Sequence, residues 1–289
     1  MLRFQESSQG VSMKPQGGLT APKPKEHGAW GMLYVPLVTA AGIAGTFNVR
    51  VLLVAAAVTF VFLSQRPYSQ LLSSLVVRRD PDLLRRNLTW LAGYWVTALL
   101  LFSSLYYVYG LIALSQFAWI AILIAATFTL FLWKNTVRSV AGQLAGICGL
   151  TLTAPLAHYA AVGEIQFLGL WLWALCILYF SSSVFFVKAV VSSFLKSRFK
   201  ATAVSTVTAR VCVFYHRGLV LLLASLFLLN QIPALAMVAF APVIARGLWG
   251  IPTGQPKLNF ARIGWTEVIY SLFFAIAMIL AMRLDTFAR

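Results

Sequence analysis

The side chains of this chain that could do chemistry are few, and most of them are basic. The candidates for binding an anion lie at the ends of apolar segments and are His27, Arg66, Lys134, Arg138, Lys188 and Arg246, with Arg262 beside them. Arginine and lysine can hold a phosphate directly through charge-assisted hydrogen bonds. The sequence therefore predicts a ring of cations that suits an amphiphile with an anionic head and an apolar tail.

A first polar group, Lys25-Glu26-His27-Gly28, precedes the first apolar segment. One interpretation is a polar gate, because His27 titrates near neutrality and Glu26 can orient or charge it. The other is an interfacial anchor, in which Trp30 lies among the lipid headgroups and Glu26 favours the amino terminus of a helix. The sequence does not choose between the two.

A second group, Gln65-Arg66-Pro67, closes the second apolar segment, and we expect Pro67 to end or kink that helix. A polar connector from Arg66 to Asn87 is expected to follow. Its acids, Asp80 and Asp82, are flanked by Arg78, Arg79, Arg85 and Arg86. Such mixed charges are typical of solvated surface pairs, so no divalent metal site is predicted there.

A third group combines Lys134 and Arg138 with the spacing Gly142-x-x-x-Gly146. The glycines favour close packing of the following helix against a neighbour. The two cations lie four residues apart and would share a face of a helix. They could either fix the orientation of the chain in the membrane or form an anion site.

Ionisable groups also occur inside apolar segments, where they tend to face a cavity or each other. These intramembrane polar candidates are Glu26, Gln65, His216, Arg217 and Glu267. We expect Glu267 to pair with Arg217 or with Arg246. The hydroxyls of Ser181 to Ser183 are expected to bond back to their own helix.

The sequence contains no nucleophile with a partnered base, no metal-ligand spacing and no phosphate-binding glycine loop. No metal and no cofactor is therefore predicted. Cys148, Cys176 and Cys212 lie inside apolar segments without paired spacing, which favours buried thiols over a disulfide or a metal site.

The composition of the chain indicates which kind of structural element positions these residues. The chain has 289 residues, 60% of them hydrophobic, with 23 Lys+Arg against 7 Asp+Glu. A charge at the bilayer centre costs roughly 2.5 kcal/mol or more, and the charges fall mostly between apolar runs. This pattern predicts a polytopic membrane protein. The net charge is +16, and the basic residues lie beside the apolar runs, where they can contact anionic headgroups. Nucleic acid is therefore not expected as a partner.

Nine apolar segments are predicted, and they lie at 28–46, 49–65, 88–109, 112–133, 138–162, 166–187, 206–229, 232–247 and 264–283. Only helices satisfy their own backbone in lipid without closing a barrel, and the segments lack the alternation of barrel strands. The expected fold is an all-α transmembrane bundle of about nine spans. The second and eighth segments are short for a full span.

Every second loop carries several basic residues, and the loops between them carry almost none. Among the loops expected on the outer face, only Arg50 is basic. The positive-inside rule then places the amino terminus in the cytoplasm. Residues 1–26 are predicted to be a disordered cytoplasmic tail, and residues 27–289 a single transmembrane domain. The expected location is a bacterial plasma membrane, with a thylakoid membrane as the alternative.

Two segments carry a family resemblance: Glu26-His27-Gly28-Ala29-Trp30-Gly31-Met32-Leu33 and Arg262-Ile263-Gly264-Trp265-Thr266-Glu267. They look like the motifs of the YwiC-like family of multi-pass membrane proteins. That family distantly resembles the UbiA superfamily of intramembrane prenyltransferases. UbiA enzymes hold magnesium and an isoprenyl diphosphate with two aspartate-rich motifs, after spans two and six. Neither motif occurs near Gln65 to Leu71 or near Ser181 to Lys188.

The resemblance implies a UbiA-like fold whose basic cytoplasmic-side cavity binds an isoprenoid or a lipid phosphate without a bridging metal. One alternative is a prenyltransferase-like enzyme with a degenerate metal site. Another is an assembly factor or subunit of a membrane complex, which would have a membrane-protein partner. Whether the chain is an enzyme is left open.

Overall fold

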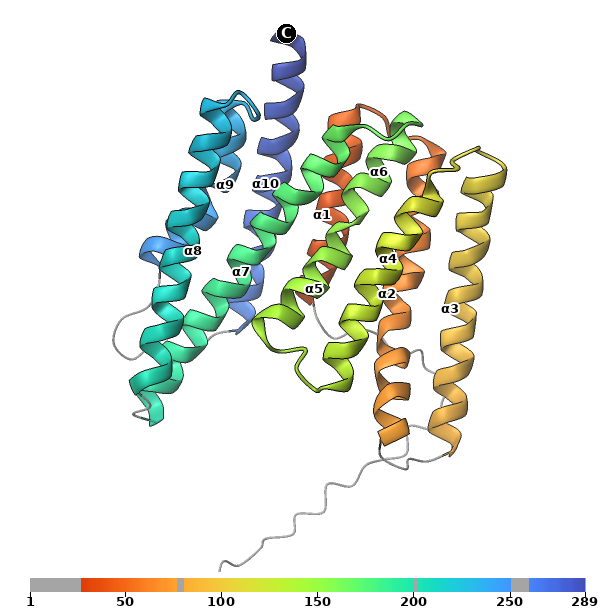
Figure 1. Ribbon diagram of the computed structural model, residues 1–289, viewed down its shortest axis with the longest axis horizontal. Helices are drawn as coiled ribbons and strands as arrows, with labels where there is room; N and C mark the ends of the chain where they lie inside the picture. Colours follow the sequence, from red (N-terminus) through yellow and green to blue (C-terminus); the bar gives the residue numbers. More distant parts are fainter. Residues whose placement is uncertain (1–26, 77–80, 200–201, 251–259, 289) are drawn as a thin grey trace, which may run out of the picture.

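The computed structural model describes residues 27–76, 81–199, 202–250 and 260–288, and within them the regular structure is entirely helical. The helices are α1 His27–Ala44, α2 Val49–Val76, α3 Pro81–Tyr107, α4 Leu114–Trp133, α5 Val140–Thr151, α6 Thr153–Val162, α7 Phe167–Phe199, α8 Thr202–Leu228, α9 Ala234–Trp249 and α10 Phe260–Ala288. They run up and down in one bundle, from α8 and α9 on one side to α3 on the other (Figure 1). The all-α bundle is confirmed.

Seven helical segments among the described residues are long and apolar enough to cross a bilayer, with α5 and α6 together forming one of them. Helices α1 and α9 are apolar but shorter. The prediction of a short second segment was wrong, because α2 has 28 residues and continues past Pro67. A proline is tolerated inside a transmembrane helix where neighbouring helices satisfy the carbonyl that it frees.

The polar connector expected between Arg66 and Asn87 is also largely absent, since α2 runs to Val76 and α3 begins at Pro81. Helix α7 similarly extends to Phe199, beyond the predicted boundary at residue 187. Hydropathy marks only the part of a helix that lies in lipid, whereas a helix can continue into water with polar side chains. The predicted boundaries were therefore too short at this end of the bundle.

The predicted segment 138–162 contains a break between α5 and α6 at Leu152. Pro155 lacks an N–H and cannot donate to the carbonyl of Thr151, four residues earlier. The hydroxyl of Thr153 donates to the carbonyl of Leu33 in α1 at 2.8 Å. The break thus gives this segment a polar contact with the centre of the bundle.

Helix α1 lies at the centre of the bundle and packs against α5, α6, α7 and α10. It comes close to α10 at Gly42, where an added Cβ would lie 2.5 Å from Ile279 Cδ1. Nearer the start of both helices, a Cβ added at Gly31 would lie 3.9 Å from Ser271 Oγ. The first and last helices of the chain therefore pack side by side and in parallel.

We call the end of the bundle where α2, α4 and α7 finish the basic end, and it points down in Figure 1. At the opposite end, Asn48 Nδ2 and Arg50 Nη2 donate to the carbonyl of Ala161 at 3.2 and 3.0 Å. These contacts satisfy a carbonyl in the last turn of α6, where an arginine also favours the negative end of the helix dipole. Arg50, the one cation among the loops expected outside, thus has a capping role.

Candidate functional site

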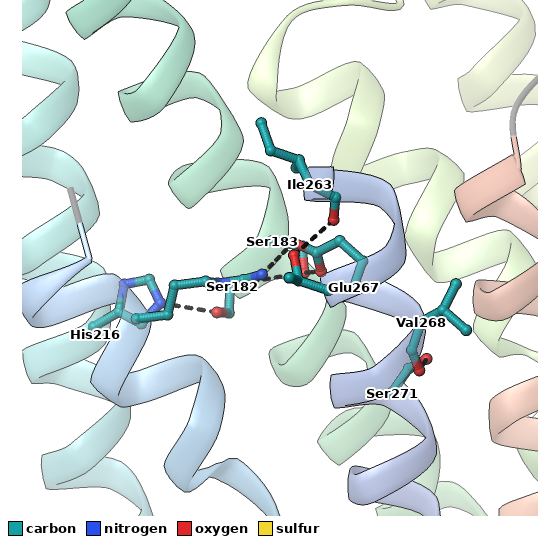
Figure 2. Close-up of polar contacts among 9 residues, drawn as sticks. Ser182, Ser183, His216, Ile263, Glu267, Val268 and Ser271 are labelled. Atoms are coloured by element: carbon teal, nitrogen blue, oxygen red, sulfur yellow. Dashed lines mark hydrogen bonds and ion pairs between the residues drawn. The ribbon is translucent and has the colours of Figure 1, made fainter. Parts of the chain in front are cut away.

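Polar side chains of α7, α8, α9 and α10 meet inside the bundle, and Figure 2 shows Ser182, Ser183, His216 and Glu267 among them. They are Ser182 and Ser183 of α7, His216 of α8, Arg246 of α9 and Glu267 of α10, and we call them the buried polar cluster. The two adjacent serines point to different partners because successive residues of a helix project about 100° apart. The cluster therefore links α7 to α8 through Ser182 and to α9 and α10 through Ser183.

Arg246 and Glu267 form an ion pair, and their side chains are only 8% and 21% exposed. Ser183 Oγ donates to Glu267 Oε2 at 2.5 Å, and Arg246 Nη2 lies 3.4 Å from Ser183 Oγ. Of the two partners considered for Glu267, the structure selects Arg246. A buried ion pair persists only where further hydrogen bonds offset the loss of hydration, and Ser183 supplies them here.

The guanidinium of Arg246 also lies between two aromatic rings. Its Cζ atom is 4.3 Å from the ring centroid of Phe186 and 5.2 Å from that of Tyr270. Both distances are within the range of cation–π attraction. The sequence analysis missed these two residues, although Tyr270 lies three residues after Glu267 and so shares its face of α10. The rings fix the plane of the guanidinium and shield the ion pair.

His216 of α8 is fully buried and contacts α7 and α9. Its Nε2 lies 2.8 Å from Ser182 Oγ, and its Nδ1 lies 2.7 Å from the carbonyl oxygen of Cys212. The neutral tautomer with its hydrogen on Nδ1 satisfies both contacts, with the serine hydroxyl donating to Nε2. On α9, a Cβ added at Gly247 would lie 2.2 Å from the imidazole ring. Gly247 is therefore the position that lets α9 approach α8.

A second group of polar residues lies at the basic end, and we call it the basic turn: residues 134–139, between α4 and α5. Lys188 Nζ of α7 donates to the carbonyl of Arg138 at 2.7 Å, and the side chains of Lys134 and Arg138 are exposed. Ser139 caps α5 by accepting from the N–H of Gly142 at 3.1 Å. These contacts bring three cations from two distant parts of the sequence together.

The glycines after the basic turn have different surroundings. A Cβ at Gly142 would lie 2.7 Å from the carbonyl oxygen of Val137, so this residue allows the turn to fold over the start of α5. A Cβ added at Gly146 would lie 3.5 Å from Phe128 of α4, which is an ordinary packing distance. The packing prediction thus describes Gly146, whereas Gly142 is required by the turn.

The remaining candidates lie apart from the buried polar cluster. Gln65 and Arg66 are half-buried on α2, where Tyr68 OH makes a 2.9 Å hydrogen bond with Thr129 of α4. Arg217 follows His216 on α8 but is exposed. Glu26 and the side chains of His27 and Arg262 lie outside the described residues. Within the described ranges, no group of three His, Cys, Asp or Glu residues is placed to hold a metal ion.

Comparison with known proteins identifies part of this architecture. Residues 24–158 match the family model described as YwiC-like protein. This part of the chain is similar to that family. The YwiC-like segment includes the Glu26 to Leu33 motif and covers α1 to α5 and part of α6, so it ends before the buried polar cluster begins. No curated protein and no solved structure matches the chain.

Proposed function

We propose that this integral membrane protein binds an amphiphile with an anionic head, an isoprenoid phosphate or another lipid phosphate, at its basic end. The positive-inside rule assigns that end to the cytoplasmic side, here of a bacterial plasma membrane. The apolar tail of the ligand would lie along the bundle at membrane depth. Binding of the phosphate would be direct, through lysine and arginine side chains.

The observation that carries the proposal is the contact between Lys188 and the basic turn. It fixes the Lys188 ammonium next to the backbone of Arg138, while the side chains of Lys134 and Arg138 are exposed beside it. Helix α5 begins at Val140, so its positive dipole end faces the same region. Two cations of the basic turn, Lys188 of α7 and the start of α5 would together form a surface that favours a phosphate over a neutral head.

Arg246 is a weaker candidate for the phosphate than the sequence implied. Its charge is already compensated by Glu267, and its guanidinium lies between Phe186 and Tyr270. A second anion would have to compete with a buried carboxylate. We therefore place the anionic head at the basic turn and give the buried polar cluster the task of holding α7 to α10 in place behind it.

A UbiA-like scaffold without its aspartate motifs is part of the same proposal. The resemblance would place the two motifs in the second half of α2 and the second half of α7. Here these positions contain Gln65, Arg66 and Lys188. A basic mouth would then replace the magnesium that normally bridges the protein and the diphosphate.

Binding of farnesyl diphosphate to the full-length protein in nanodiscs tests the proposal, with farnesol as the ligand that lacks the anionic head. We expect farnesyl diphosphate to bind more tightly than farnesol, and Lys188→Gln combined with Arg138→Gln to weaken it by about tenfold or more. Arg85→Gln, at an exposed arginine of α3, is the matched control. Equal binding of both ligands, or no effect of the double variant, would contradict the proposal.

Arg66→Ala tests whether α2 contributes to the same head site. Mild-detergent purification, lipid extraction and mass spectrometry would show whether an isoprenoid accompanies the wild-type chain and is lost from Arg66→Ala or Lys188→Ala. We expect the loss to be larger for Lys188→Ala, since Lys188 contacts the basic turn directly. A wild-type chain without any enriched lipid argues against the proposal.

A further inference from the structure

An apolar groove runs between α7 and α8 and has a volume of about 320 Å³. Its walls include Leu178 and Phe185 of α7 and Val211, Tyr215, Gly218 and Leu222 of α8. Tyr215 OH donates to the carbonyl of Leu178 at 2.7 Å, and the ring of Tyr215 stacks on Phe185 with centroids 4.4 Å apart. Because this hydroxyl is satisfied within the protein, the groove presents an apolar surface along its whole length.

The groove lies at membrane depth, since its two walls belong to the apolar spans Phe167–Leu195 and Val207–Leu228. Its α8 wall extends from Val211 to Leu222, which is roughly 16 Å at the helical rise of 1.5 Å per residue. A Cβ added at Gly218, in the middle of that wall, would have no packing neighbour within 4 Å among the described residues. The groove therefore has room for an apolar chain that runs parallel to the two helices.

The groove leads along α7 toward Lys188. Leu178 and Phe185 lie seven residues apart and share one face of α7, and Lys188, three residues after Phe185, lies on the same side one turn further on. Figure 1 shows α7 between α8 and α5, the helix that follows the basic turn. Since Lys188 contacts the basic turn, it lies on the side of α7 that connects the groove with that turn.

A contact between α7 and α8 gives the level of Lys188 on α8. Ser192 Oγ, four residues after Lys188, lies 2.5 Å from Thr208 Oγ1. The two helices are antiparallel, so Lys188 is nearly level with Val211, which follows Thr208 by three residues. Val211 is the wall residue nearest the start of α8. The groove therefore ends at about the level of Lys188.

The basic turn gives the position of this level relative to the membrane surface. It joins the spans Leu114–Trp133 and Val140–Val162, so it lies where the chain leaves the apolar region at the basic end. Lys188 reaches the turn with its side chain, because its Nζ donates to the carbonyl of Arg138 at 2.7 Å. A lysine at the edge of the lipid extends its ammonium toward the surface in this way. The lower end of the groove is thus next to the cations of the proposed head site.

We propose that the groove holds the apolar chain of a single-chain amphiphile whose anionic head lies at Lys188 and the basic turn. This inference rests on the function proposed above and adds where the chain lies and how many chains the ligand has. Charge and apolar surface follow each other along α7 in the same order as head and chain in such a molecule. The groove lies between one pair of helices, which suits one chain better than the two chains of a glycerophospholipid. A groove at the opposite end is lined in part by Asn230, Gln231 and Asp285, so it suits an apolar chain less well.

Binding of three diphosphates to the full-length protein in nanodiscs tests where the chain lies. Inorganic diphosphate, dimethylallyl diphosphate and farnesyl diphosphate carry the same kind of head, with no chain, a short chain and a long chain. We expect the affinity to rise along this series, and Gly218→Leu to lower the affinity for farnesyl diphosphate about tenfold by filling the groove. The affinity for the other two ligands should stay unchanged, because neither reaches Gly218. Gly93→Leu, at an exposed glycine of α3 without a packing neighbour within 4 Å, is the matched control.

Competition between two phosphate monoesters tests the number of chains. Lysophosphatidic acid has one acyl chain, and phosphatidic acid has two. We expect lysophosphatidic acid to displace farnesyl diphosphate from the wild-type protein at a concentration about tenfold lower than phosphatidic acid. Equal competition by the two lipids would overturn the assignment of a single chain.

Unchanged affinity for farnesyl diphosphate in Gly218→Leu would overturn the inference and leave the head site of the proposed function intact. Failure of the head site has a different signature, which is equal binding of farnesyl diphosphate and farnesol to the wild type. A loss of all three diphosphates in Gly218→Leu would also overturn the inference, since the substitution would then act outside the groove. Gly218 is exposed, and a wild-type elution profile on size-exclusion chromatography checks the fold. Leu222→Trp, at the far end of the groove, is a second variant for which we expect the same selectivity.

Discussion

At the opposite end of the bundle, Asn48 and Arg50 donate to the backbone carbonyl of Ala161, whereas in the buried polar cluster Arg246, Glu267 and Ser183 contact one another through their side chains. Both groups join helices that are far apart in sequence. The first satisfies carbonyls that any helix end leaves free. The second introduces two charges that the fold itself does not require.

The two regions differ in what the loss of one partner costs. A capped helix end is needed wherever a helix stops inside a bundle, so the contacts of Asn48 and Arg50 need no further explanation. An ion pair at membrane depth is expensive to bury and stabilises only while it is complete. The pair of α9 and α10, with Ser183 of α7, therefore holds these helices together only as long as each of its members is present.

The largest effect is expected from Glu267→Ala, which leaves the Arg246 guanidinium buried without its counter-charge. Removal of one partner of a buried pair costs on the order of 3 kcal/mol or more. Thermal unfolding in detergent, followed by size-exclusion chromatography, should show a clear loss of stability. The double variant Arg246→Gln and Glu267→Gln should be more stable than Glu267→Ala. A double variant that is no better would mean that the charges do not depend on each other.

A somewhat smaller loss is expected from Gly247→Ala, because the new Cβ would lie 2.2 Å from the His216 ring. Overpacking of this kind costs roughly 1–3 kcal/mol. Adding His216→Ala should recover part of the lost stability by vacating the space. Gly218→Ala, which meets nothing within 4 Å, serves as the control and should unfold like the wild type. Equal unfolding temperatures for Gly247→Ala and Gly218→Ala would contradict the close approach of α8 and α9.

At the opposite end, Asn48→Ala should lower stability by about 1–2 kcal/mol. The change removes the donor to Ala161 and also the side-chain oxygen that accepts from the N–H of Val51 at the start of α2, at 3.1 Å. Thr127→Ala, which removes only an exposed bond within α4, is the control for the same unfolding measurement. Asn48→Ala should leave farnesyl diphosphate binding unchanged. A large loss of binding in Asn48→Ala would show that the opposite end of the bundle is more than structural.

The smallest effect on stability is expected from Lys188→Gln, since the lost contact with Arg138 is exposed to solvent. We expect less than about 1 kcal/mol. The same variant should weaken farnesyl diphosphate binding, so stability and binding would separate at this position. If unfolding temperature and affinity fall together by a large amount, the role of Lys188 is structural.

The number and order of the helical segments followed from hydropathy, because lipid forces each apolar stretch to satisfy its own backbone. Helix ends were less predictable where a helix leaves the lipid, as in α2 and α7. The break at Leu152 had a visible signal in Pro155, whose missing N–H affects the carbonyl four residues earlier. That signal could have been used.

The sequence predicted only some contacts of the candidate site, because the others depend on how the helices pack against one another. Because ionisable groups inside apolar segments tend to face each other, the sequence narrowed the partner of Glu267 to two arginines, and the structure shows that it is Arg246. The aromatic contacts of Arg246 and the fit of His216 against Gly247 depend on how α8 and α9 approach each other. The distance between α8 and α9 cannot be predicted from the sequence pattern of either helix alone. The basic turn likewise needed the fold to bring Lys188 to Arg138.

The parallel packing of α1 and α10 also has a consequence for how the chain is made. Helix α1 leaves the ribosome before α10, yet Ile279 of α10 lies against α1 at Gly42. A nascent chain that ends before residue 260 therefore holds an incomplete bundle whose central helix lacks a neighbour. Membrane insertion can proceed segment by segment, but the final assembly of this protein has to wait for its carboxyl-terminal helix.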